Sequence, residues 1–160
     1  MKNFLRLYGA PIAIVILGLI VAFMFMAPAP PKHVVIAAGG KGGAYAATAE
    51  AYAAFLRDFD IEADVLETAG SVDNLDRIKR GEADIGIVQT GIVAEGQAGN
   101  ARSLGAIFHE PLWLFHRSNV RIEKLQDLAG LKVAIGPEGS GVRVLAGLIL
   151  KEAGVTADQY

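Results

Sequence analysis

A glycine-rich loop at residues 39–43, with the sequence GGKGG, is the feature of this chain that most directly indicates chemistry. It follows a short apolar run and precedes apolar residues at helical spacing, which predicts a strand, a loop and a helix. Backbone N–H groups of such a loop, at a helix N-terminus, can bind a carboxylate or another anion. A tight turn that requires positive φ is the alternative. A nucleotide site is disfavoured, because the loop lacks the phosphate-loop spacing and Tyr45 stands where the dinucleotide motif has its last glycine.

Several polar residues stand where strands or loops lead into helices. Ser71 and Ser140 each precede an apolar helical pattern, so each hydroxyl is expected to cap its helix, to contact a ligand, or to do both. Gln89 follows an apolar strand, where an amide side chain faces a cleft rather than a core. Glu110, followed by Pro111, either lines the cleft or lies in a solvated turn. We therefore expect ligand contact at Gln89 and leave both roles open for the two serines.

The composition argues against several classes of site. The chain has 160 residues, with 15 Lys and Arg, 17 Asp and Glu, and no Cys. Its charges are scattered and form no basic stripe for a nucleic acid, and without Cys it has no disulfide, thiolate metal site or Cys nucleophile. His33, His109 and His116 lack metal-ligand spacing, and neither Ser71 nor Ser140 lies in a G-x-S-x-G motif. We therefore expect no metal, no cofactor and no catalysis.

The order of the predicted elements indicates an α/β fold with a parallel sheet. Right-handed crossovers between strands and helices place the first three strands in the order 2-1-3. Ligands bind beyond the carboxyl ends of the strands where this order reverses, so loops 39–45, 68–71 and 89–90 are expected to share one cleft. The predicted strands cover residues 33–38, 61–67, 83–88 and 132–135. Five helices are predicted: one begins near Tyr45, one begins at Ser71, and a short one after Thr90 reaches about residue 97. The other two cover residues 122–129 and 140–153.

The pattern of strand, glycine-rich turn and helix occurs a second time, in the segment KVAIGPEGSGVRVLAGLIL. We therefore expect a first α/β lobe at residues 32–118 and the start of a second α/β lobe at residues 119–160. One strand and one helix cannot bury a sheet with two faces, so we expect the second lobe to be incomplete here and the chain to continue.

Residues 1–31 are expected to form a membrane anchor and a Pro-rich linker. Residues 9–27 carry no charge, and at ~1.5 Å per residue a helix of this length spans most of a ~30 Å hydrocarbon core. Lys2 and Arg6 precede this run, so the positive-inside rule places the N-terminus in the cytoplasm and the α/β part outside the inner membrane. A cleaved signal peptide is disfavoured, because Pro30 would follow the small-x-small site at residues 27–29.

The soluble part resembles the TAXI family of TRAP-transporter solute-binding proteins, and in particular its membrane-anchored members. The resemblance covers residues 33–155 and rests on the order and spacing of five segments, AAGGKGGAY, ETAGSVDNL, GEADIGIVQT, EPLWLF and LAGLKVAIGPEGSGVR. It implies the type II periplasmic-binding-protein fold. It also implies a receptor that closes two lobes over a small solute, an organic acid or an amino acid, and delivers it to membrane permease subunits without catalysis.

The family's binding positions match nine residues of this chain. The family commonly has hydroxyl residues where this chain has Lys41 and Ala44, so the first loop loses hydroxyls and gains a cation here, and the resemblance does not identify the solute. A membrane-tethered sensor or adaptor with the same fold and no transport role is the alternative function. The residues that the resemblance assigns to ligand binding are Gly42, Gly43, Tyr45, Ser71, Asn74, Gln89, Thr90, Ser140 and Val142.

Overall fold

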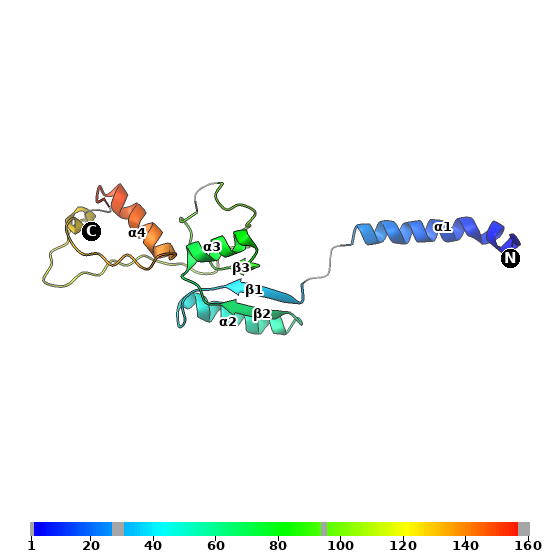
Figure 1. Cartoon of the computed structure of the whole chain (residues 1–160), viewed down its shortest axis with the longest axis horizontal. Helices are drawn as coiled ribbons and strands as arrows, with labels where there is room; N and C mark the ends of the chain where they lie inside the picture. The colour runs from blue at the N-terminus through cyan, green and yellow to red at the C-terminus, as the bar shows by residue number, and fades with distance from the viewer. Residues whose placement is uncertain (1, 27–30, 94–95, 157–160) are drawn as a thin grey trace. The chain divides into compact units, whose positions relative to one another are not determined.

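The structure is a computed structural model that describes residues 2–26, 31–93 and 96–156 (Figure 1). The chain divides into two units, Met1–Pro31 and Lys32–Tyr160. The boundary between the units falls where the sequence predicts the end of the linker. Each unit is described by itself below.

The first unit is formed by one helix, α1 (Lys2–Met24), which continues through Pro11. Its apolar side chains face all directions around the axis, and Ile14, Leu17, Leu19, Ile20 and Phe23 are each more than half exposed. Within the part of the chain that the structure describes, no helix combines the length and the apolar character needed to cross a membrane. The helix is therefore observed, and its membrane-spanning role stays a prediction.

The second unit contains a parallel sheet of three strands, β1 (His33–Ala37), β2 (Glu62–Leu66) and β3 (Ile85–Gly86). The strand order is β2-β1-β3, which confirms the predicted order 2-1-3. β1 pairs with β2 along its full length, from His33 opposite Glu62 to Ala37 opposite Leu66. β3 pairs with β1 at two positions only, so it is shorter than the predicted strand at residues 83–88.

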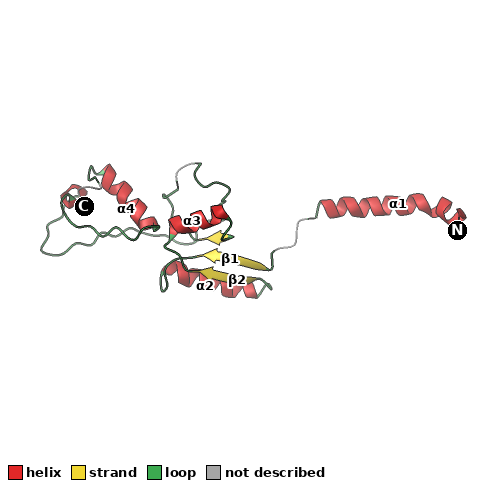
Figure 2. Ribbon diagram, in the orientation of Figure 1, coloured by secondary structure: helices red, strands yellow, loops and turns green. Residues whose placement is uncertain are grey.

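Two helices cover opposite faces of this sheet, α2 (Ala44–Arg57) and α3 (Ser71–Arg80) (Figures 1 and 2). The main core forms where Val34, Ile36 and Ala38 of the β1 segment pack against Ala49 of α2. On the other face, Gly86 lets α3 approach closely, since a methyl group added there would lie 2.8 Å from Cδ1 of Ile78. Both helices therefore start at the carboxyl edge of the sheet, where the predicted cleft lies.

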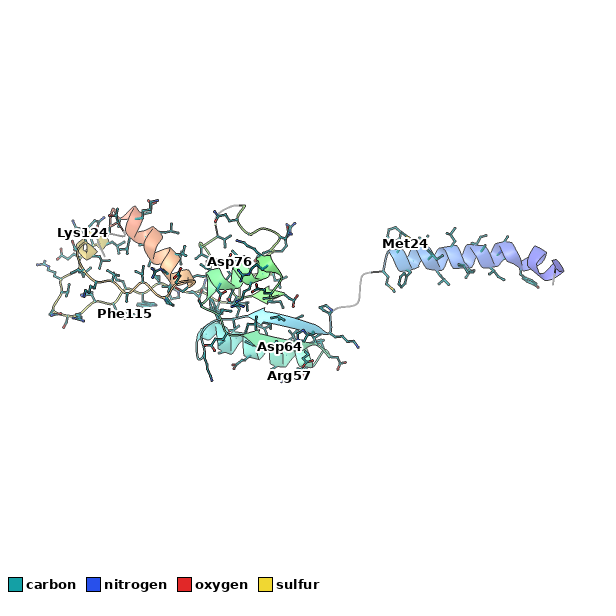
Figure 3. All side chains as sticks on the ribbon, in the orientation of Figure 1. Met24, Arg57, Asp64, Asp76, Phe115 and Lys124 are labelled. Carbon is teal, nitrogen blue, oxygen red and sulfur yellow. The ribbon has the colours of Figure 1, made fainter. Side chains whose placement is uncertain are left out.

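The region after residue 100 contains a 3-10 helix, η1 (Leu125–Leu128), and a helix, α4 (Gly141–Glu152). Leu128, Leu150 and Val155 form a small core of their own. The strand predicted at residues 132–135 is absent, because the described chain offers it no neighbouring strand to pair with. Phe115 lies on an irregular segment and is 85% exposed (Figure 3).

The predicted helix reaching about residue 97 is also not found. The described residues on either side of positions 94–95 form turns and bends, and Ala94 and Glu95 themselves lie outside the described residues. Three glycines in this stretch, Gly91, Gly96 and Gly99, have positive φ, a conformation that interrupts an α-helix. Residues 90–100 therefore form an irregular loop after β3 wherever the structure describes them.

Asn74 of α3 joins the carboxyl ends of all three strands. Its side-chain amide nitrogen donates to the carbonyl of Ala38, just after β1, at 2.6 Å and to the carbonyl of Ile87, just after β3, at 2.7 Å. Its side-chain oxygen accepts from the hydroxyl of Thr68, just after β2, at 2.5 Å. Asn74 is fully buried, so each of these bonds replaces one that water would otherwise make.

We predict that Asn74→Ala destabilises the fold by about 3 to 5 kcal/mol, because it removes the donor to two buried carbonyls and the acceptor of the Thr68 hydroxyl. The measurement is urea unfolding of the full chain in mild detergent. Asp76→Ala is the control on the same helix, since Asp76 is half exposed in a weak pair with Lys79, and we expect a change within about 0.5 kcal/mol. Equal effects of the two substitutions would contradict the role of Asn74.

Candidate functional site

A chain of hydrogen bonds connects three of the predicted site residues at the carboxyl edge of the sheet. The hydroxyl of Tyr45, on the first turn of α2, lies 3.2 Å from Oγ of Ser71. The backbone N–H of Gln89, after β3, donates to the same Oγ at 2.9 Å. Residues from the three loops that follow β1, β2 and β3 therefore meet at one hydroxyl group. The predicted convergence of these loops is confirmed for Tyr45, Ser71 and Gln89.

Ser71 does not cap α3 with its side chain, contrary to one of the two roles that the sequence left open. The N-cap residue is Gly70, whose φ of 125° lies in a region that L side chains rarely adopt. This geometry makes Ser71 the first helical residue and turns its hydroxyl toward Tyr45 and Gln89. Ser71 is 1% exposed, so it belongs to the floor of the site.

The loop before α4 closes over this floor. The backbone N–H groups of Val72 and Asp73, in the first turn of α3, donate to the carbonyl of Gly139 at 3.0 and 3.3 Å. A methyl group added at Gly141 would lie 2.6 Å from Oε1 of Gln89 and 2.9 Å from Oγ of Ser71. The N-termini of α3 and α4 therefore meet at the predicted site, and the loop before α4 contributes to it through its backbone.

Ser140 caps α4, which confirms one of its two predicted roles. Its hydroxyl accepts from the N–H of Arg143 at 3.4 Å and donates to the carbonyl of Pro137 at 2.6 Å. Ser140 is 8% exposed, and a methyl group added at Gly70 would lie 3.3 Å from its Cα. Ser140 is therefore placed against the start of α3, with its hydroxyl used within its own loop.

The remaining predicted residues lie around this centre rather than in it. Asn74 lies beneath Ser71 with its amide fully engaged, so it positions the loops. Gly43 caps α2 and its N–H donates to the carbonyl of Gly40, while Gly42 is exposed with a φ of 77°. Thr90 is exposed, and Val142 packs beside Gly136. Ligand contact at each of these residues stays a prediction.

Glu110 is a charged side chain that is bonded to this site. The hydroxyl of Tyr45 donates to its Oε2 at 2.7 Å, across a separation of 65 residues in the chain, and the ring of Phe108 lies 6.1 Å from that of Tyr45. The sequence left Glu110 undecided between the cleft and a solvated turn. The structure places it in contact with the site, although its own residue remains exposed.

The chemistry of this arrangement is that of binding. The hydroxyl groups of Tyr45 and Ser71 and the side-chain amide of Gln89 can form hydrogen bonds, and Glu110 offers a negative charge. The N–H groups of Val72 and Asp73 donate to the carbonyl of Gly139. Among the residues that the structure describes, no cluster of three or more His, Asp or Glu side chains could hold a metal ion. Burial, together with the bond to Glu110 and its charge, raises the pKa of Tyr45 to about 12, while the bond to Ser71 acts to lower it.

We predict that Tyr45 stays protonated beyond pH 10, its ordinary pKa, and loses its proton near pH 12. Glu110→Gln removes the negative charge, so the pKa of Tyr45 should fall while remaining above 10, because burial is the larger cause. The measurement is an ultraviolet titration of the full chain, with a Tyr45→Phe sample subtracted to isolate Tyr45. A midpoint near 10 in the unaltered protein would show that the hydroxyl is not enclosed as described.

The family relationship of the chain is established by its match to one known domain. Residues 36–160 match the model of the NMT1-like family. The match covers β1 from Ile36 onward, both helices of the sheet and the α4 region, and therefore all of the site residues described above. It covers well over half of the 160-residue chain. The chain belongs to the NMT1-like family, whose domains are of the periplasmic-binding-protein type.

Proposed function

We propose that this protein is an extracytoplasmic receptor that captures a small carboxylate-bearing solute. The observation that carries the proposal is the meeting of Tyr45, Ser71 and Gln89 with the first N–H groups of α3 at the junction of the two lobes. Helix N-termini favour acceptor groups, because their N–H groups lack partners within the helix and the helix dipole is positive there. The membership in a binding-protein-like family supports the same function.

The solute class that the site favours is an organic acid or an amino acid. The donors at the start of α3 suit a carboxylate, and hydrogen bonds to a charged group are stronger than those to a neutral one. Glu110, which accepts a hydrogen bond from the hydroxyl of Tyr45, supplies the opposite preference and favours a group that carries hydrogen-bond donors or a positive charge. A solute with both kinds of group satisfies the two sides of the site together.

We further propose that the receptor delivers its solute to the membrane permease subunits of a TRAP-type secondary transporter, as the resemblance to the TAXI family implies. No catalytic role is proposed. The described residues around the site offer hydrogen bonds and the carboxylate of Glu110, and neither Ser71 nor Ser140 lies in a G-x-S-x-G motif.

The N-terminal helix is proposed to anchor this receptor in the bacterial inner membrane, with the α/β unit on the outer side. The support is the apolar surface of α1, which exposes large side chains in all directions as a lipid-facing helix does. The linker that follows, with the sequence APAPPK, favours an extended polyproline conformation that separates a domain from a membrane.

We predict that Gln89→Ala weakens solute binding about ten- to a hundred-fold, because it removes a side-chain hydrogen bond to a charged group. The fold should lose less than about 1 kcal/mol, since the backbone N–H of Gln89 still donates to Ser71. The measurement is calorimetric titration of the full chain in detergent with acetate, succinate and L-glutamate, beside thermal unfolding.

The matched control for this experiment is Gln97→Ala, which truncates the same side chain at an exposed loop position. Gln97→Ala should leave the dissociation constant unchanged. Unchanged affinity in Gln89→Ala, or affinity lost only together with the fold, would remove Gln89 from the binding site. Absence of binding to every probe would favour the sensor or adaptor function instead.

We predict that the full chain stays in the membrane fraction during extraction with alkaline carbonate, because the uncharged run at residues 9–27 is expected to remain inserted. Leu17→Arg places a charge near the middle of the apolar run and should reduce insertion, at a cost of about 3 kcal/mol. Immunoblots of the membrane and soluble fractions provide the measurement. Release of the unaltered protein with a new N-terminus near Pro30 would show cleavage and contradict the anchor.

A further inference from the structure

The start of α3 already holds an oxygen atom from the other lobe. In an isolated helix the first N–H groups have no partner, and they are available to a ligand. Here Val72 and Asp73 both donate to the carbonyl of Gly139, at 3.0 and 3.3 Å. The carbonyl of Gly139 therefore occupies the position at which the proposed function places the carboxylate of the solute.

Three glycines allow this close approach of the two backbones. A methyl group added at Gly139 would lie 2.9 Å from Cβ of Ala69, and one added at Gly141 would lie 2.6 Å from Oε1 of Gln89. One added at Gly70 would lie 3.3 Å from Cα of Ser140. Cβ atoms of side chains essentially never come within 3.0 Å of another atom, so Gly139 and Gly141 permit this contact because they lack side chains. At Gly70 the φ of 125° is itself a conformation that other residues rarely adopt.

The loop that carries Gly139 is fixed to α4. The hydroxyl of Ser140 binds the carbonyl of Pro137 and accepts from the N–H of Arg143, and the guanidinium of Arg143 donates to the carbonyl of Gly136 at 3.1 Å. These bonds join residues 136–143 into one piece. Removing Gly139 from α3 therefore requires α4 and its loop to move away together.

We infer that this loop is an internal competitor of the solute, and the inference rests on the proposed function. In the solute-free receptor, the carbonyl of Gly139 occupies the N–H groups of α3 and holds the two lobes together. A carboxylate accepts stronger hydrogen bonds than a carbonyl and interacts favourably with the helix dipole, so the solute displaces the loop. The apparent affinity is then reduced by the fraction of receptor in which the loop is in place.

The test compares Gly139→Ala with Gly154→Ala, a substitution at a glycine whose φ angle is almost the same. Gly139 has a φ of 80°, and Gly154 has a φ of 77° with nothing within 4 Å of an added methyl group. Gly139→Ala adds the contact with Ala69, and Gly154→Ala does not. The double variant Gly139→Ala with Ala69→Gly removes the opposing methyl group and keeps the strain.

The first measurement is hydrogen exchange at the amides of Val72 and Asp73, in the full chain without solute. We expect slow exchange in the unaltered protein, exchange about tenfold faster or more in Gly139→Ala, no change at these amides in Gly154→Ala, and substantial recovery in the double variant. Rapid exchange in the unaltered protein, or no effect of Gly139→Ala, would overturn the inference without bearing on solute binding.

The second measurement is titration of the same proteins with acetate, succinate and L-glutamate. If the loop competes with the solute, Gly139→Ala should bind the solute more tightly. The dissociation constant should fall by about the same factor by which the substitution lowers the equilibrium constant for the loop contact. Binding that Gly139→Ala weakens or leaves unchanged would overturn the inference alone, because the loop would then hold the solute or be independent of it. Failure of all three probes to bind any of the proteins would overturn the proposed function, and the inference with it.

Discussion

The amide of Asn74 holds the carboxyl ends of the three strands together, and the positions of the site residues depend on that constraint. It binds the carbonyls after β1 and β3 and the hydroxyl after β2 from a single buried position. Ser71 lies one helical turn before Asn74, so the same constraint fixes the floor of the site. The three loops meet because one side chain satisfies a polar group of each, as buried polar groups require.

Close backbone contact between the start of α3 and the loop before α4 is the second constraint. At the start of α3 and the start of α4, glycine replaces side chains at Gly70, Gly139 and Gly141, and the two helix N-termini meet without intervening groups. Two helix N-termini that point at one place favour an acceptor group there. The acceptor at the start of α3 is the backbone carbonyl of Gly139, so this contact joins the loop before α4 to the first turn of α3.

The elements predicted correctly are those whose signals are local. Alternation of Ile61, Ala63 and Val65 with charged residues indicates β2, and Gly81 with a φ of 71° ends α3 as the sequence predicts. The sheet order followed from the handedness of crossovers. By contrast, residues 132–135 form no strand, because strand formation depends on a neighbour that no local pattern reveals.

The site was predicted less completely, for physical reasons that differ between residues. Gln89 was identifiable from its place after β3, and Tyr45, which follows β1, was identified through the family resemblance. The bond between Tyr45 and Glu110 joins residues 65 positions apart, and the role of Gly139 is that of a backbone carbonyl, which leaves no side-chain signature. The conformation of Gly70 determines whether Ser71 caps its helix or faces Gln89, and the sequence does not predict the φ angle of Gly70.

We propose that the junction of α3 with the loop before α4 binds a small carboxylate-bearing solute. Mass spectrometry of the small molecules that the full chain retains after purification from its native membrane tests this most directly. We expect one predominant organic acid or amino acid in the unaltered protein. It should be depleted in a Ser71→Ala, Gln89→Ala double variant that remains folded. A retained molecule without a carboxylate, or one held equally by the variant, would contradict it.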